Sequence, residues 1–220
     1  MRTLTKESRA GLTPAEMLRV LLAGNARFAN NLKANRDLQL QVQATAQGQY
    51  PGAVILSCMD SRTSAELIFD QGLGDIFSIR IAGNVVTPDV LGSIEYAVAA
   101  AGVKLVMVLG HTACGAVGGA CDNVRMGNLT GTLERILPAI GRVSGDTSSA
   151  GFKDRVAAAN VCVSIDAILE QSPIVRERLA SGEVGLAGAM YNVSTGLVEV
   201  MNACAYVREA APEAAMLVVG

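Results

Sequence analysis

Short apolar runs along the chain mark the strands of a buried sheet. Residues 53–56 (AVIL) and 105–109 (LVMVL) are continuous apolar runs bounded by turn residues, a pattern typical of strands buried on both faces. Residues 76–81 (IFSIRI) alternate imperfectly and predict another strand. Residues 184–193 and 197–201, separated by Ser-Thr-Gly, predict a hairpin at the end of the sheet.

Helical periodicity begins near the N-terminus. Thr13-Pro14-Ala15-Glu16 is a capping box with proline at the first helical position, and apolar residues follow at helical spacing. Residues 1–11 are polar and predict a loose arm, whereas the Gln-rich segment 38–49 could be a short helix or a loop. The amphipathic face of the helical arm, residues 1–50, could cover the core of its own chain or lie on another. We expect it to pack on a partner subunit.

Further helices are predicted between and after these strands. Residues 88–101 and 156–169 have helical composition, and Ser-Pro precedes a shorter helix that closes near residue 182. Such alternation of helices and strands predicts an α/β fold with a mainly parallel central sheet flanked by helices. The length favours a single domain over residues 1–220, with its α/β core in residues 51–220.

Composition and charge exclude several classes of protein. Half of the 220 residues are apolar but only 4% are aromatic, which suits helices packed on a buried parallel sheet. The net charge of −2 comes without a basic stripe, so no nucleic-acid partner is expected. The longest apolar stretch, residues 96–110, is interrupted by Gly102 and Lys104 and is too short to span a membrane. Charges in the first residues oppose a signal peptide, and we expect a cytoplasmic protein without membrane contacts.

The cysteines predict metal or catalytic use. Their number, five, is odd and no secretion signal is visible, which favours reduced thiols over a disulfide framework. Cys121, Cys162 and Cys204 are interpreted as small buried residues. The other two cysteines lie beside polar chemistry.

Two polar clusters follow two of the predicted strands. Cys58, Asp60 and Arg62 come directly after the first strand, and His111 and Cys114, with the only histidine of the chain, follow the strand at 105–109. Parallel strands present their carboxyl ends at one edge of the sheet, where α/β proteins bind their ligands. Cysteine sulfur and histidine nitrogen are zinc ligands. We therefore predict a zinc site formed by Cys58, His111 and Cys114.

The fourth zinc position decides what this site can do. Asp60 could bind the zinc itself and close the site. Alternatively, Arg62 could hold Asp60 in a charge-assisted pair, leaving Asp60 to accept a hydrogen bond from a zinc-bound hydroxide. Two thiolate ligands offset the charge of the metal, so we expect a raised pKa for its water and activity that increases into the alkaline range.

These residues resemble the β-class carbonic anhydrases. The family pattern Cys-x-Asp-Ser-Arg followed by Gly-His-x-x-Cys-Gly is present as residues 58–62 and 110–115, and the similarity continues through 75–84, 93–98 and 188–196. The resemblance implies reversible hydration of CO2 to bicarbonate and a proton, with one Zn2+ per subunit. It also implies a mainly parallel α/β sheet and self-association as a dimer or larger assembly, such as a tetramer.

Position by position, the resemblance implies functional roles for nine residues. It assigns zinc binding to Cys58, His111 and Cys114, a dyad beside the metal-bound hydroxide to Asp60 and Arg62, and substrate contacts to Gln49, Phe77, Tyr96 and Gly115. Some pocket walls would come from a partner subunit. The branch with an inhibitory bicarbonate site has Trp at the position of Gln49, and this chain has no Trp. We therefore expect an open, water-bearing site without that inhibition.

Two residues depart from the family pattern. Met59 replaces a smaller residue and is expected to point away from the metal, and Ile81 stands where many members have Asn.

Two other functions are alternatives. A hydrolase of CS2 or COS would use the same fold and ligands. A non-catalytic zinc protein would have Asp60 closing the site, although it would need neither Arg62 nor Gln49.

Overall fold

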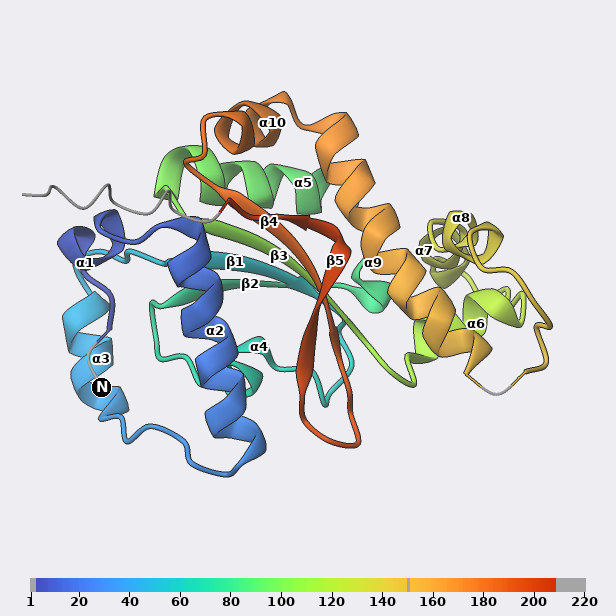
Figure 1. Cartoon of the computed structure of the whole chain (residues 1–220), viewed down its shortest axis with the longest axis horizontal. Helices are drawn as coiled ribbons and strands as arrows, with labels where there is room; N and C mark the ends of the chain where they lie inside the picture. The colour runs from blue at the N-terminus through green and yellow to red at the C-terminus, as the bar shows by residue number, and fades with distance from the viewer. Residues whose placement is uncertain (1–2, 150, 209–220) are drawn as a thin grey trace, which may run out of the picture.

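A five-stranded sheet forms the centre of the computed structural model, which describes residues 3–149 and 151–208 (Figure 1). Its strand order is β2-β1-β3-β4-β5, and only the β4–β5 pair is antiparallel. The strands are β1 (Ala53–Ser57), β2 (Ile76–Arg80), β3 (Leu105–His111), β4 (Gly185–Tyr191) and β5 (Val198–Tyr206). The predicted mainly parallel α/β sheet and its terminal hairpin are confirmed. The ends of the predicted domain, residues 1–2 and 209–220, lie outside the described residues.

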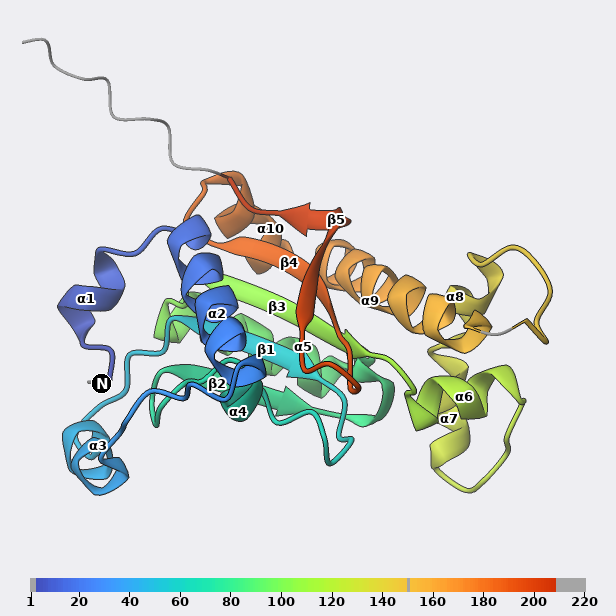
Figure 2. The ribbon, with the colours of Figure 1, turned by 60° about the horizontal axis from the view of Figure 1, so that its bottom comes forward.

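Helices cover both faces of the sheet (Figures 1 and 2). Their bounds are α1 (Lys6–Ala10), α2 (Pro14–Ala29), α3 (Leu38–Thr45), α4 (Ala65–Ile68), α5 (Pro88–Glu95), α6 (Gly115–Cys121), α7 (Leu129–Glu134), α8 (Leu137–Gly141), α9 (Phe152–Gln171) and α10 (Pro173–Ala180). Helix α5 continues as a π-helical turn, Tyr96–Ala101. Among the described residues, no helix is both long and apolar enough to cross a membrane.

Two apolar clusters hold the helices to the sheet. Alternate residues of β1, such as Val54 and Leu56, pack with α5, α9 and α10, whereas Ile55 faces α2 and α4 on the other side. Met17 and Leu21 of α2 are fully buried in that second cluster. Helix α2 therefore covers the core of its own chain, one of the two roles considered for it. Contact of the arm with a partner subunit stays a prediction.

The N-terminal segment is more ordered than its polar composition predicts. Residues 6–10 form α1, and a capping box begins it: the Ser8 hydroxyl accepts the Thr5 N–H at 2.8 Å, and the Thr5 hydroxyl accepts the Ser8 N–H at 3.2 Å. The loose arm predicted for residues 1–11 is thus wrong for this part. The Gln-rich segment resolves as helix α3, with Asp37 as its N-cap.

A disulfide joins α9 to β5, contrary to the expectation of reduced thiols. Cys162 and Cys204 are bonded, with their Cα atoms 5.5 Å apart, whereas Cys58, Cys114 and Cys121 are free. The pair is separated by 42 residues, so only the packing of α9 against the terminal hairpin brings the two sulfur atoms together. An odd number of cysteines excludes a structure in which every cysteine forms a disulfide, but it is compatible with this single one.

A third apolar cluster lies beyond the carboxyl ends of β1 and β3. It contains Cys58 and Cys114 together with residues of α6, α7, α8 and the first half of α9, among them Phe152, Val156 and Ile136. Figure 2 shows these helices gathered at the end of the sheet where β3 runs into α6. The buried cysteines of the two segments that follow β1 and β3 therefore pack against these helices.

Candidate metal centre

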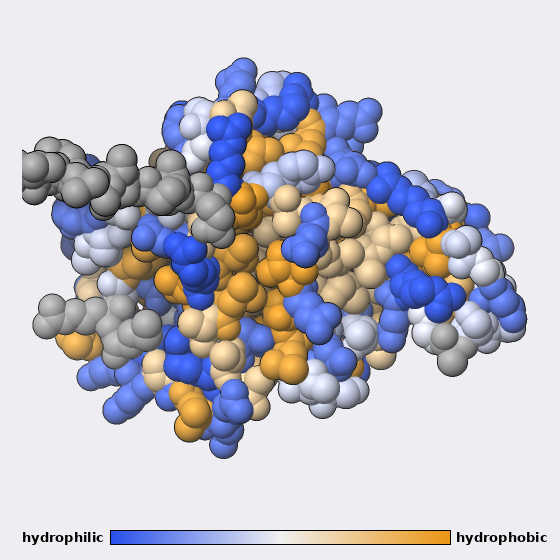
Figure 3. All heavy atoms as spheres, in the orientation of Figure 1, coloured by the Kyte–Doolittle hydropathy of each residue, from blue (hydrophilic) through white to orange (hydrophobic). Residues whose placement is uncertain are grey.

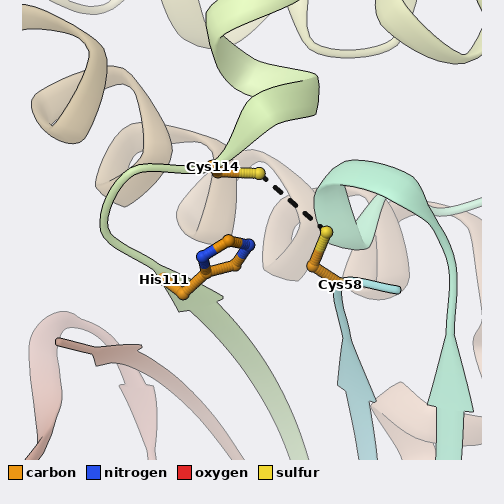
Figure 4. Close-up of side chains that lie close together, drawn as sticks. All are labelled: Cys58, His111 and Cys114. Atoms are coloured by element: carbon orange, nitrogen blue, oxygen red, sulfur yellow. Dashed lines mark hydrogen bonds between the residues drawn. The ribbon is translucent and has the colours of Figure 1, made fainter. Parts of the chain in front are cut away.

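Three buried side chains converge at the carboxyl edge of the sheet (Figure 4). Cys58 follows β1, His111 ends β3, and Cys114 is the N-cap residue of α6. Their ligand atoms all lie within 4.8 Å of one another, and the two Sγ atoms are 3.9 Å apart. The side chains point toward one another, so the predicted grouping of these three residues is present.

The donor set fits a zinc ion. Nδ1 of His111 lies 2.9 Å from the Thr112 carbonyl oxygen, which orients the ring. Nε2 of His111 is buried and has no hydrogen-bond partner among the described residues, a costly state for a polar atom unless a ligand occupies it. Two sulfurs and one such nitrogen match the three protein ligands found in catalytic zinc sites, which keep a fourth position for water.

Electrostatics favour one thiolate even before a cation binds. The pKa of Cys58 is lowered because the Cys114 thiol donates a hydrogen bond to its sulfur; burial opposes this, and His111 and the Gly83 N–H support it. The Gly83 amide lies 3.3 Å from the sulfur. The pKa of Cys114 is raised because it retains the shared proton. A bound divalent cation would displace that proton, since the ligand form of cysteine is the thiolate.

Asp60 and Arg62 form a bidentate ion pair beside this cluster. Nε and Nη2 of Arg62 donate to Oδ1 and Oδ2 of Asp60 at 2.9 and 2.8 Å, and the Arg62 backbone N–H also donates to Oδ1 at 2.9 Å. The Arg62 hydrogen bond is the main reason that the pKa of Asp60 is well below its usual range. Asp60 is therefore held by Arg62 in this structure, and its carboxylate stays ionised.

Two residues that the sequence analysis missed fix the backbone of this loop. Nη2 of Arg80 donates to the Asp60 carbonyl at 2.6 Å, and its Nε donates to the Cys58 carbonyl at 3.2 Å. The Thr63 hydroxyl lies 3.0 Å from the same Cys58 oxygen. Thr63 directly follows the Cys-x-Asp-Ser-Arg motif, so its place in the sequence could have indicated its role. No sequence pattern indicates the role of Arg80, at the end of β2.

Helix α9 contacts both loops that flank the metal centre. Asn160 donates from Nδ2 to the Gly83 carbonyl at 2.7 Å, and Asp154 accepts the Ala113 N–H at 2.8 Å. Gly83 and Ala113 both have positive φ, 69° and 53°. Such a conformation favours glycine and costs an alanine about 1–2 kcal/mol. The Ala113 backbone is thus held by contacts rather than by its own preference.

The predicted pocket residues do not all lie together within one chain. Gln49 precedes β1 and Cys58 follows it, so a strand of five residues, about 17 Å long, separates them. Gly115 lies beside Cys114 as the first residue of α6. The rings of Phe77 and Tyr96 are 6.3 Å apart.

Phe77 and Tyr96 line a hollow of about 670 Å³ along the edge strand β2. Tyr96 is 60% exposed there. Met59 is 64% exposed, as its predicted orientation away from the metal requires. Ile81 packs against two of the apolar clusters, and nothing in the structure gives it a polar role. The pocket predicted from the sequence is therefore divided between the metal edge and the β2 edge.

The fold and this side-chain cluster define a candidate α/β metalloenzyme, and comparison with known proteins identifies its family. Residues 53–198 match the family model described as carbonic anhydrase. Carbonic anhydrase 2 of Mycobacterium tuberculosis is 38% identical over 191 residues, covering 83% of this chain and 90% of that protein.

Solved structures agree with this comparison. The β-carbonic anhydrase CafA of Aspergillus fumigatus is 28% identical with a TM-score of 0.67, covering 89% of this chain and 93% of that one. The Coccomyxa β-carbonic anhydrase, solved with acetazolamide, is 25% identical with a TM-score of 0.66, covering 84% and 86%. The chain belongs to the β-class carbonic anhydrase family.

Proposed function

We propose that this chain catalyses the zinc-dependent, reversible hydration of CO2 to bicarbonate and a proton. The observation that carries the proposal is the juxtaposition of the buried Cys58–His111–Cys114 cluster with the ionised Asp60–Arg62 pair. Family membership supports the same reaction. One Zn2+ per subunit is proposed, held by Nε2 of His111 and the two sulfurs.

Zinc bound there would supply Lewis acidity, which lowers the pKa of a coordinated water and so provides a nucleophile well below the pKa of free water. Both oxygens of Asp60 accept hydrogen bonds from Arg62, so Asp60 is positioned as an acceptor. Because its carboxylate stays ionised, it has no proton to donate at neutral pH. Its proposed role is to accept a hydrogen bond from the attacking water and orient a lone pair toward CO2.

The substrate pocket is proposed to be completed by self-association. Gln49 and the Phe77–Tyr96 pair lie away from the metal edge of their own chain, so they would contact substrate at the site of a partner. Figure 3 shows apolar surface gathered between α2 and the β5 hairpin. Leu197, in the turn before β5, is 49% exposed. Such surface suits contact between subunits in a dimer or tetramer. Gln49 in place of Trp supports an open site without the inhibitory bicarbonate.

The decisive experiment is stopped-flow CO2 hydration by the zinc-loaded protein between pH 7 and 9. Turnover that increases with pH is expected, and COS and CS2 assayed with the same preparation test the hydrolase alternative. Absence of CO2 turnover at pH 9 with one zinc per chain would contradict the proposal. In that case a non-catalytic zinc protein would explain the site.

A cytoplasmic location is also proposed, because Cys58, Cys114 and Cys121 are free thiols. The Cys162–Cys204 disulfide is uncommon in that compartment, where thiols are usually kept reduced. Cell fractionation with antibody detection tests the location directly. Recovery of the protein outside the cytoplasmic fraction would overturn it.

A further inference from the structure

Helix α9 reaches the metal centre through one carboxylate, and we propose that Asp154 is a positioning residue for the Asp60–Arg62 pair. Its Oδ1 accepts the backbone N–H of Ala113 at 2.8 Å, across 41 residues of sequence. Ala113 lies between His111 and Cys114. The inference rests on the proposed function, in which Asp60 orients the attacking water.

Ala113 is held by hydrogen bonds on both sides of its Cα atom. Its N–H is bound by Asp154, and its carbonyl accepts Nη2 of Arg62 at 3.2 Å. The same Nη2 donates to Oδ2 of Asp60 at 2.8 Å. An unbroken series of hydrogen bonds therefore runs from α9 through Ala113 and Arg62 to Asp60. Because φ of Ala113 is 53°, which alanine rarely adopts, the backbone would relax if either contact were lost.

The carboxylate of Asp154 is the fixed end of this series. Phe152 and Val156, which flank it in the first turns of α9, are buried in the cluster that contains Cys58 and Cys114. Ala113 itself is exposed and lies between the end of β3 and the start of α6, outside both elements. Helix α9 therefore supplies rigidity that the loop lacks.

A simpler role for Asp154 is electrostatic, because it is the acidic residue in the first turn of α9. A negative charge there stabilises the helix dipole. The two roles predict opposite effects of substituting Asp154 by asparagine and by glutamate. Asparagine keeps the acceptor oxygen and removes the charge, whereas glutamate keeps the charge and moves the acceptor outward by one methylene group. Comparison of these two variants separates positioning from helix stabilisation.

The experiment uses Asp154→Ala, Asp154→Asn and Asp154→Glu in the full chain, loaded with zinc. Asp166→Asn is the control, because Asp166 is also on α9 but pairs with Arg142 at the surface, 2.7 Å away. Stopped-flow hydration gives kcat/KM, and metal analysis gives the zinc content. We expect a loss of about tenfold or more in kcat/KM for the Ala and Glu variants at full zinc content. The Asn variant and the Asp166→Asn control should remain close to wild type.

An Asn variant as slow as the Ala variant, or a Glu variant as fast as wild type, would overturn the inference. So would an Ala variant with wild-type kcat/KM. A second readout uses the visible absorption of the Co2+-substituted proteins, which reports ligand geometry without turnover. We expect the bands to shift in the Ala and Glu variants and to stay in place in the Asn variant. If wild type itself hydrates no CO2, the proposed function fails while these spectra still decide whether Asp154 positions the loop.

Discussion

Arg62 holds Asp60 through two parallel hydrogen bonds, from Nε and Nη2, at 2.9 and 2.8 Å. Both oxygens of the carboxylate are occupied, and the side chain of Asp60 is only 18% exposed. A carboxylate in this arrangement cannot turn toward a neighbouring cation without breaking the pair. In the proposed zinc site, the state of the fourth position would thus depend on Arg62, whose described side-chain hydrogen bonds are to Asp60 and the Ala113 carbonyl.

Replacement of Arg62 tests this link. Arg62→Ala releases Asp60 and is expected to lower kcat/KM for CO2 hydration by about 10- to 100-fold with zinc still bound. Arg62→Lys keeps the charge but cannot form the paired hydrogen bonds, so it should recover little activity. The matched control is Arg142→Ala, which breaks the exposed ion pair between Arg142, at the end of α8, and Asp166 of α9. Wild-type activity in Arg62→Ala would contradict the positioning role.

The depressed pKa of Asp60 predicts how activity depends on pH. Its carboxylate is ionised from pH 6 to 9, so Asp60 contributes no titration to the profile in that range. The increase of activity toward alkaline pH is attributed instead to deprotonation of the attacking water. We expect Asp60→Asn to lower kcat at every pH and to keep the alkaline increase. A wild-type profile that is flat between pH 6 and 9 would refute this assignment.

The same pKa makes a prediction about stability. A carboxyl group whose pKa is lower in the folded than in the unfolded state stabilises the fold above the unfolded value, and this contribution is lost as the pH falls through the folded value. Urea unfolding of the zinc-free protein should therefore show a larger difference between wild type and Asp60→Asn at pH 7 than at pH 3. An equal difference at both pH values would mean that the ion pair contributes nothing to folding.

Metal removal should affect both activity and folding. Cys58, His111 and Cys114 are all buried, so the bound ion is expected to stabilise the third apolar cluster. At a free zinc concentration 1,000 times the dissociation constant, binding would add about 4 kcal/mol to the free energy of unfolding. Chelation should abolish hydration and lower Tm, and Zn2+ or Co2+ should restore both. An unchanged Tm after complete zinc removal would show that the cluster folds without the ion.

The disulfide between α9 and β5 should stabilise the fold without affecting zinc binding. It closes a loop of 42 residues, for which the chain-entropy model gives about 4 kcal/mol. Cys162→Ser with Cys204→Ser should therefore lower the free energy of unfolding in urea while zinc content stays at one per chain. Cys121→Ser, which removes a free cysteine, is the control and should leave unfolding unchanged. Equal stability of the double variant and wild type would mean that the bridge does not persist in solution.

The features that follow from local patterns in the sequence could be predicted. The strands before Cys58 and His111 are continuous apolar runs, and parallel pairing places their ends together, so the metal cluster followed from two segments. The contacts that could not be predicted cross long distances in sequence without a periodic signal. Asp154 meets Ala113 across 41 residues, and Cys162 meets Cys204 across 42. Only the packing of α9 on the sheet determines these contacts. Helix α1 was missed because its cap pairs Thr5 with Ser8, where the usual partner is Glu or Gln.

The only histidine of the chain is buried among the metal-centre side chains, and this restricts how protons can leave. CO2 hydration releases a proton at every turnover, and imidazole is the side chain whose ordinary pKa suits its transfer near neutral pH. His111 is one of the proposed zinc ligands, so the chain has no second imidazole that could relay the proton. The proton is then expected to pass to water or directly to a dissolved base. Turnover at saturating CO2 should consequently increase with the concentration of an imidazole buffer at constant pH and ionic strength.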